Sequence, residues 1–375
     1  MDKKIPEFPQ KLPGTFWGIT VFFNPYRYKN KLSNYRIFRE ANKKQGLNLL
    51  TVELAFGNAP FELSQNDSDI LIQLRTETIL WHRERLINIG LESLPCDCDK
   101  VVWLDNDIIF KNDNWINETS RLLERYVVIQ PFSYIARLQK GVYDINPNRP
   151  PAWYDSSYNT PAIAYRYAEN IATDCYVSGG TWANRIDLYK GIGLYDRLVV
   201  GGADFFMACA FYNKPLPEAF IYPDKLLASY ERWKKEMFKR VQGSVYYTKG
   251  LIVHLWHGDM RNRLYRWRNT EILKKYDFDP DTDIKLDKNG CWVWASDKPQ
   301  LHTAVKRYFY LRNEEDSWYK DLIYSIYVAN TFPVVIRLYL GISSFIGRRV
   351  KDFFIRYFPK IYNRLRKIKR TLRFS

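Results

Sequence analysis

The stretch from Val101 to Phe110 constrains the fold most, because it consists of two short apolar segments with two carboxylates between them. Its sequence is VVWLDNDIIF, so one residue separates Asp105 from Asp107. Because successive strand residues point to opposite faces, we expect Asp105 and Asp107 to share one face and Asn106 to lie on the other. Two such groups suit Mg²⁺ or Mn²⁺ that also binds the phosphates of a ligand. A solvated turn after a strand is the alternative interpretation.

Apolar runs alternate with amphipathic segments in the first third of the chain. We expect strands at 17–23, 47–56 and 70–74, and helices at 35–44 and 78–94. This alternation is typical of an α/β fold with a mostly parallel sheet covered by helices. Such sheets bind ligands where their strands end. The first strand ends in Asn24-Pro25-Tyr26-Arg27, which places a cation at that edge.

Three polar or glycine-containing positions outside this motif have the residue types of a binding or catalytic site. Arg83 lies in the second expected helix, where an exposed position on an amphipathic surface is the alternative. Gly201 and Gly202 allow the backbone to approach a ligand closely, and they precede Asp204 at the start of an apolar, helix-like segment. Asp204 is therefore a candidate catalytic base, or a residue that only caps the helix.

Two of the chain's four histidines, His254 and His257, interrupt the apolar segment 251–258. Positions three apart on a strand face opposite sides, so both bind one ion only if the strand ends between them. We favour His257, which precedes Gly258, as a metal ligand. We interpret His254 as a supporting or core residue.

In this order, the motifs resemble those of GT-A fold glycosyltransferases, most closely the β1,4-galactosyltransferase branch and its bacterial relatives. The motifs are Asn-Pro-Tyr-Arg at 24–27, His-Arg-Glu-Arg-Leu-Ile-Asn at 82–88, Leu-Asp-Asn-Asp at 104–107, Val-Ser-Gly-Gly at 177–180, Gly-Gly-Ala-Asp at 201–204, and His257. Their shared order is more specific than any one motif. The chain departs from the family in two places, since the acidic cluster after Gly-Gly is reduced to Asp204 and the preceding tryptophan is absent.

The resemblance implies a metal-dependent, inverting transferase that uses a nucleotide-sugar donor, which we expect to be a UDP-sugar. Asp204 would accept the proton of the acceptor hydroxyl. Asp107 and His257 would bind Mn²⁺ or Mg²⁺, and Asp105 would lie near the ribose. The residues implied to bind the nucleotide sugar are Asn24, Pro25, Tyr26, Arg27, Arg83, Asn88, Asp105, Gly180, Gly201 and Gly202.

The last fifth of the chain is strongly basic. Residues 301–375 hold 16 Lys and Arg against 5 Asp and Glu, so they carry +11 of the chain's net charge of +16. Because cations alternate there with aromatic and aliphatic residues, we expect amphipathic helices on an anionic membrane surface. Pro333 and Arg337 interrupt the apolar stretch, so a spanning helix is the weaker alternative, beside a soluble helical cap. No nucleic-acid-binding module accompanies the charge, and we expect no nucleic-acid partner.

We therefore expect an N-terminal extension at 1–14, a GT-A catalytic domain at 15–300 and a basic amphipathic helical region at 301–375. The polar, proline-containing start has no signal-peptide pattern, and the five cysteines form no usual zinc or disulfide pattern. The expected location is the cytoplasm, on the inner face of the cell membrane. The acceptor would be a cell-surface glycan or its lipid-linked precursor. The alternatives are a non-catalytic glycan-binding or scaffold protein on the same fold, and a phosphosugar hydrolase.

Overall fold

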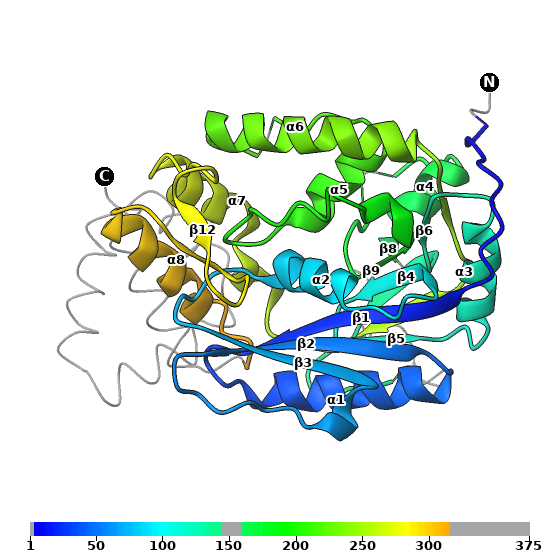
Figure 1. Ribbon diagram of the computed structural model, residues 1–375, viewed down its shortest axis with the longest axis horizontal. Coiled ribbons are helices and arrows are strands. Elements are labelled where there is room, and N and C mark those ends of the chain that lie inside the picture. The colour runs from blue at the N-terminus through cyan, green and yellow to red at the C-terminus, as the bar shows by residue number, and fades with distance from the viewer. Residues whose placement is uncertain (1–3, 145–159, 174, 219, 316–375) are drawn as a thin grey trace, which may run out of the picture. The chain divides into compact units, whose positions relative to one another are not determined.

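A seven-stranded mixed sheet forms the centre of the protein (Figure 1). The computed structural model describes residues 4–144, 160–173, 175–218 and 220–315. In the order β10-β6-β9-β4-β1-β2-β3, six strands run in one direction and β9 runs against them. The strands are β1 (Thr15–Phe23), β2 (Asn48–Phe56), β3 (Ile70–Thr76), β4 (Cys98–Leu104), β6 (Val128–Gln130), β9 (Thr181–Arg185) and β10 (Val245–Tyr247).

A second sheet has four strands in the order β5-β11-β7-β8. They are β5 (Ile108–Phe110), β7 (Tyr134–Arg137), β8 (Thr160–Pro161) and β11 (Leu251–His254), and a separate hairpin pairs β12 (Ile284–Leu286) with β13 (Trp292–Trp294). The two apolar segments around the Asp-Asn-Asp motif therefore form strands of different sheets, because β4 belongs to the large sheet and β5 to the small one.

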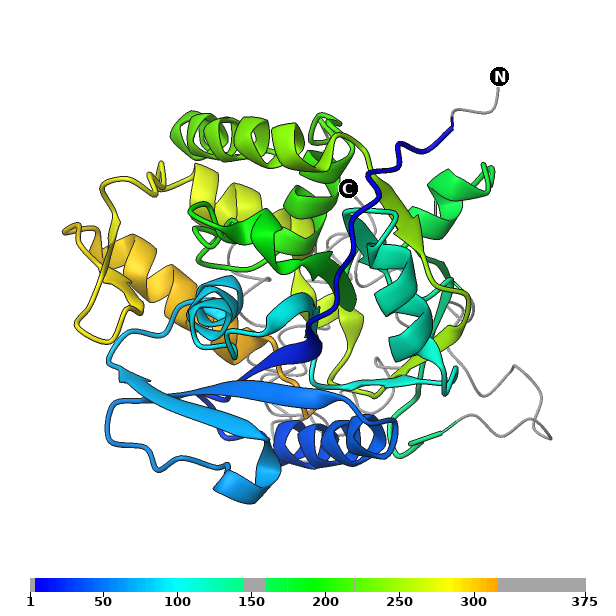
Figure 2. The ribbon, with the colours of Figure 1, turned by 45° about the vertical axis from the view of Figure 1, so that its right-hand side comes forward.

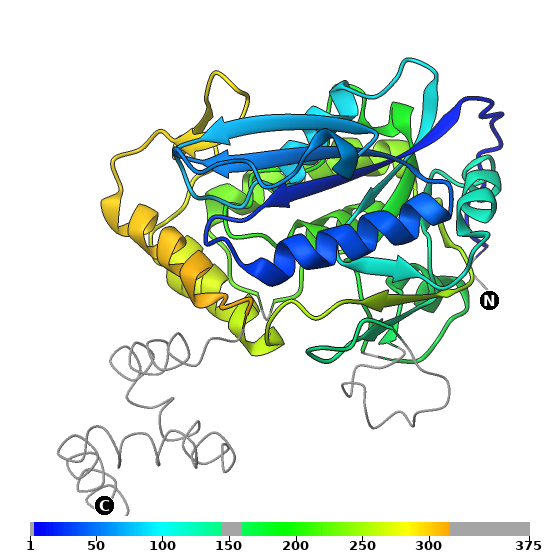
Figure 3. The ribbon, with the colours of Figure 1, turned by 90° about the horizontal axis from the view of Figure 1, so that it is seen from below.

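Helices cover both faces of the large sheet. They are α1 (Lys29–Lys44), α2 (Arg83–Glu92), α3 (Trp115–Leu123), α4 (Ile163–Ala168), α5 (Ala203–Phe211), α6 (Asp224–Val241), α7 (Tyr265–Trp267) and α8 (Pro299–Leu311), with a π-helical segment at Arg268–Lys274. Helix α1 lies on one face of β1–β3 and α2 on the other, which Figures 1 and 3 show from two directions. The predicted α/β fold with a mostly parallel sheet between helices is confirmed.

The side-chain alternation of β1 explains why both faces need cover. Ile19 and Val21 belong to the core that also contains Leu86 of α2. Phe22 points to the opposite face of β1 and packs against Tyr35 of α1, with the ring centroids 5.5 Å apart. Because successive strand residues point to opposite faces, an apolar residue at nearly every position is typical of a strand buried on both sides.

The N-terminal segment before β1 is extended and lies beside α3 (Figure 2). The backbone N–H groups of Phe8 and Gln10 donate to the carbonyl groups of Arg125 and Glu124, at 2.8 and 2.9 Å. These two bonds attach residues ahead of the sheet to the turn that follows α3.

Helix α8 and the residues after it pack on the loop that follows β1. The Tyr26 hydroxyl donates to the Lys306 carbonyl at 3.0 Å, and Glu314 lies 3.4 Å from Lys31 near the start of α1. The expected basic region, which begins at Leu301, thus starts within the described structure. Its remainder, from residue 316, and the membrane helices expected there lie outside the described residues. Among the helices that the structure does describe, none has the length and apolar character needed to cross a membrane.

Candidate active site

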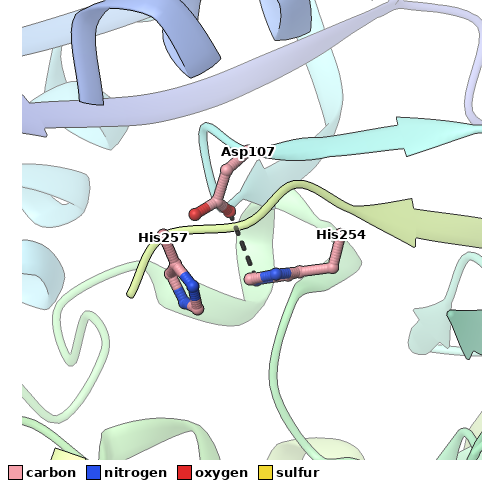
Figure 4. A group of neighbouring side chains, drawn as sticks. All are labelled: Asp107, His254 and His257. Atoms are coloured by element: carbon pink, nitrogen blue, oxygen red, sulfur yellow. Dashed lines mark ion pairs between the residues drawn. The ribbon is translucent and has the colours of Figure 1, made fainter. Parts of the chain in front are cut away.

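Asp107, His254 and His257 converge at the turn between β4 and β5 (Figure 4). Strand β5 pairs with β11 in antiparallel register, with Ile108 opposite His254, and this pairing brings His254 to the turn. One donor atom from each of the three side chains lies within 4.8 Å of the others. The distance from Asp107 Oδ1 to His254 Nε2 is 3.3 Å. One carboxylate and two imidazoles thus share a single site.

Both histidines lie at this site, although the sequence favours only His257. Both histidines can bind one ion only if the strand ends between them, and β11 does end at His254. Their ring centroids are 4.4 Å apart. The Leu255 N–H donates to the Asp107 carbonyl at 2.7 Å, and Arg263 donates to the His257 carbonyl at 2.9 Å. These bonds hold the backbone on both sides of the site, and we count His254 among the candidate ligands.

The protonation states of these side chains fit a metal cation. Burial lowers the pKa of His254 to about 4 and the pKa of His257 well below its usual value, so both imidazoles are neutral at neutral pH. Burial, together with the nearby charge of Asp105, raises the pKa of Asp107 to about 8. Asp107 Oδ1 is buried and accepts no hydrogen bond from the described residues. This donor set fits Mn²⁺ better than Mg²⁺, which prefers oxygen ligands.

The raised pKa of Asp107 predicts that metal binding releases a proton. Below about pH 8 the cation must displace the carboxyl proton, so affinity for Mn²⁺ should rise with pH up to about 8 and level off above it. We expect release of nearly one proton per Mn²⁺ at about pH 7 and little at about pH 9. Isothermal titration calorimetry in buffers with different ionisation enthalpies measures this number. Equal proton release at both pH values would contradict the assignment of the proton to Asp107.

Asp105 and Asp107 lie in a turn, so the expectation that strand alternation puts them on one face is wrong. Strand β4 ends at Leu104 and β5 begins only at Ile108. The Asp105 N–H donates to the Gly180 carbonyl at 2.8 Å, and the Asp105 carboxylate forms an ion pair with an arginine. Asp107 instead contacts a histidine. The two carboxylates are neighbours that have different partners.

Arg83 connects this turn to a second carboxylate. It is the first residue of α2 and is 5% exposed, so the alternative of an exposed position is excluded. Its Nη2 lies 2.6 Å from Asp105 Oδ1, and its Nη1 lies 2.9 Å from Asp204 Oδ1. Nη1 also lies 3.1 Å from Glu84 Oε1, and the guanidinium lies over the ring of Trp103. A hydrogen bond to Asp204 and an ion pair with Asp105 thus place both carboxylates around one guanidinium.

Asp204 lies in the first turn of α5 but does not cap that helix. The N-cap residue is Gly202, at φ +109°, and no side chain forms a cap hydrogen bond. A Cβ at Gly202 would lie 2.9 Å from Arg268 Nη2, and a Cβ at Gly179 would lie 3.2 Å from Asp204 Oδ2. Burial raises the pKa of Asp204 to about 6, against the opposing effect of Arg83. Its side chain is 29% exposed, so a ligand can reach the carboxylate.

The four residues at the end of β1 form a turn. Asn24 closes it, because the Tyr28 N–H donates to Asn24 Oδ1 at 2.9 Å and Asn24 Nδ2 donates to the Tyr28 carbonyl at 3.0 Å. Pro25 and Tyr26 are half-buried, and Arg27 is exposed with φ +53°. The Asn24 side chain thus has a structural role in shaping this loop.

Asn88 contacts a different loop from Arg83, although both lie on α2. Its Nδ2 donates to the Leu194 carbonyl and to Asp196, each at 3.1 Å, and its Oδ1 accepts from the Leu194 N–H at 2.8 Å. The Asn88 amide is therefore used to hold the loop that contains Leu194. Gly201 has φ +81°, and a Cβ there would lie 3.0 Å from the indole ring of Trp81.

Two charged residues of the site were not identified from the sequence. Glu84 is buried beside Arg83 and accepts a hydrogen bond from Trp81 Nε1 at 3.0 Å, and burial raises its pKa to about 7. An acidic residue next to a candidate arginine was the only available signal. Arg263 is buried behind His257 in a segment without periodic pattern, and the sequence contains no signal for it.

The structure is similar, at low sequence identity, to GT-A glycosyltransferases and to nucleotidyltransferases. The catalytic domain of Drosophila β1,4-galactosyltransferase 7, in complex with xylobiose, is 13% identical, and the match covers 77% of this chain and 98% of that one at a TM-score of 0.34. S. aureus TarS is 13% identical over 64% of this chain and 36% of its own, at a TM-score of 0.33. GalNAc-T7 with UDP, GalNAc and Mn²⁺ is 13% identical. That match covers 70% of this chain and 49% of GalNAc-T7, at a TM-score of 0.38.

No protein-family model matches the chain, and no curated protein matches it in sequence. Because the TM-scores lie below 0.5, the proposals below rest on the arrangement of side chains in this chain.

Proposed function

We propose that this protein is a Mn²⁺-dependent, inverting glycosyltransferase that transfers a sugar from a nucleotide-sugar donor to a hydroxyl group. The observation that carries the proposal is the double ion pair of Arg83, which joins Asp105 beside the candidate metal ligands to Asp204 at the start of α5. An inverting transfer needs a cation site for the leaving diphosphate and, nearby, a carboxylate that accepts a proton. This arrangement of Asp105, Arg83 and Asp204 supports both.

Asp204 acts as the general base of this reaction. As the acceptor oxygen attacks the anomeric carbon, the hydroxyl proton moves to the Asp204 carboxylate, and the bond from that carbon to the donor phosphate breaks with its electron pair on the diphosphate. Arg83 lowers the pKa of Asp204, and this effect partly offsets that of burial, so the carboxylate is mostly ionised at neutral pH. Arg83 also fixes the direction in which the carboxylate faces.

Asp107, His254 and His257 hold the metal. When bound, Mn²⁺ supplies Lewis-acid stabilisation of charge on the diphosphate. The lowered pKa values of both histidines keep their nitrogen lone pairs available at neutral pH. Asp105, whose backbone N–H donates to the Gly180 carbonyl, is assigned to the ribose of the donor.

We assign a UDP-sugar as the donor and a cell-surface glycan or its lipid-linked precursor as the acceptor. The support for this acceptor is the net charge of +11 in residues 301–375, because a basic surface attracts anionic membranes on which such precursors are carried. The same charge supports a peripheral position on the inner face of the cell membrane.

The test is turnover of a panel of nucleotide sugars by the full chain, with and without Mn²⁺ and with lipid-linked and soluble glycan acceptors. We expect one donor to be consumed only when Mn²⁺ is present, with the sugar found on the acceptor in inverted configuration. Nuclear magnetic resonance of the new linkage reads the configuration. Free sugar formed without any dependence on acceptor would instead indicate a hydrolase. Metal-dependent binding without turnover would indicate a glycan-binding or scaffold protein.

A further inference from the structure

Arg27 and Arg83, the two cations that the resemblance places near the donor nucleotide, do not supply a free positive charge beside the candidate metal ligands. Arg83 is buried among Glu84, Asp105 and Asp204, so its charge is already more than balanced by carboxylates. Arg27 is exposed on the loop after β1. A diphosphate bound to a single divalent cation keeps part of its negative charge. In proteins an arginine or lysine usually binds the phosphate oxygens and neutralises this remainder. The cation for this charge must therefore be sought elsewhere near the three candidate ligands.

Arg137 is such a cation, and the pairing of strands places it beside His254. Strands β7 and β11 are parallel, and Arg137 is the register partner of His254. Partners in register share a face of the sheet, so the side chain of Arg137 leaves the strand on the same face as the His254 imidazole. The ring centroid of His254 lies 4.4 Å from that of His257, so Arg137 leaves its strand next to the group of candidate ligands.

Arg137 is half-buried, and its guanidinium has no partner among the described residues, either in a hydrogen bond or in an ion pair. The other cations near the site differ in this respect. Arg263 pairs with Glu314 at 2.9 Å and donates to the His257 carbonyl, and Lys31 lies 3.4 Å from the same glutamate. A half-buried cation without a counter-charge is costly to keep beside a metal site unless it meets an anion there.

We propose that Arg137 binds the diphosphate of the nucleotide-sugar donor, next to the metal held by Asp107, His254 and His257. This inference rests on the proposed function and adds a donor-binding residue to it. A planar guanidinium can donate two parallel hydrogen bonds to phosphate oxygens, which a lysine cannot. Arg137 thus supplies the positive charge that Arg83, occupied by carboxylates, does not supply.

The test measures binding of Mn²⁺ with inorganic pyrophosphate, and of Mn²⁺ with UDP, to the full chain by isothermal titration calorimetry. We expect Arg137→Gln to lower the affinity for pyrophosphate and for UDP by at least about tenfold, which is the effect of losing a charge-assisted hydrogen bond. Affinity for Mn²⁺ alone should not fall, because Arg137 does not bind the metal and its replacement removes a positive charge beside the site. Arg137→Lys should lie between wild type and Arg137→Gln, since it keeps the charge and loses the planar fork.

Arg121→Gln is the matched control, because Arg121 on α3 is exposed and its loss changes the net charge equally. It should bind both anions like the wild type. Thermal melting of each variant shows whether it is folded. Wild-type affinity of folded Arg137→Gln for pyrophosphate and UDP would overturn this inference and leave the proposed function standing. Failure of the wild-type protein itself to bind either anion with Mn²⁺ would overturn both.

Discussion

Replacing Asp204 with Asn is expected to lower kcat by about 10² to 10⁴, the usual contribution of a general base. The amide keeps the shape of the side chain and an oxygen that can accept from Arg83, which lies 2.9 Å away in the wild type. It cannot take the proton of the acceptor hydroxyl at neutral pH. Because Asp204 does not belong to the metal triad, the affinity for Mn²⁺ and for the donor should change little. Steady-state kinetics with the donor found in the panel measure both effects.

The pH dependence gives this prediction a second readout. The pKa of Asp204 is about 6, and the base is active when ionised, so wild-type kcat should rise with pH through about 6 and then level off. The residual rate of Asp204→Asn should lack this step. Asp224→Asn is the matched control, because Asp224 is in the first turn of α6 and its side chain is 92% exposed. A kcat of Asp204→Asn close to that of this control would exclude Asp204 as the base.

Replacing Asp107 with Asn should weaken Mn²⁺ binding by at least about 100-fold, since loss of a supporting residue alone costs about 10- to 100-fold. The substitution removes the charged oxygen from a group whose other two members are neutral imidazoles. Donor binding and transfer should be lost with the metal. Electron paramagnetic resonance of free Mn²⁺ in a titration measures the affinity without any nucleotide.

Asp113→Asn is the control for this variant, because Asp113 follows β5 in the same segment and is exposed. It should bind Mn²⁺ like the wild type. Asp107→Asn should also abolish the proton release expected at about pH 7. Retention of Mn²⁺ affinity by Asp107→Asn would mean that the metal is bound elsewhere, and the candidate metal site would be wrong.

Much of the fold follows from local patterns. The apolar run at 17–23 becomes β1, and the runs at 47–56 and 70–74 become β2 and β3, with shifts of only one or two residues at most ends. The end points of helices were harder to predict. Helix α1 begins at Lys29 rather than near residue 35, and α2 begins at Arg83 rather than near residue 78. No side chain caps either helix, so the sequence contains no start signal of the usual kind.

The candidate site was predicted in its residue types more than in its contacts. The carboxylates at 105, 107 and 204 and the histidine at 257 were all proposed from motifs. Their partners were not, because Arg83 and Asp204 are separated by 121 positions in the chain and meet only after α2 and α5 pack on the sheet. Asn88 is a motif residue that was expected to bind the nucleotide sugar, but in the structure its side chain bonds to the backbone of Leu194.

Local patterns were sufficient to predict β1, β2 and β3 and the helix that begins after Gly201 and Gly202, because periodicity and turn chemistry act over a few neighbouring residues. They did not predict the turn at 105–107, where strand alternation was expected to continue. Packing between distant segments puts β4 and β5 in different sheets, brings His254 to the same carboxylate as His257, and places Arg137 beside His254. These outcomes depend on strand register and on packing between distant segments. Local periodicity contains no information about which distant strands pair or in which register.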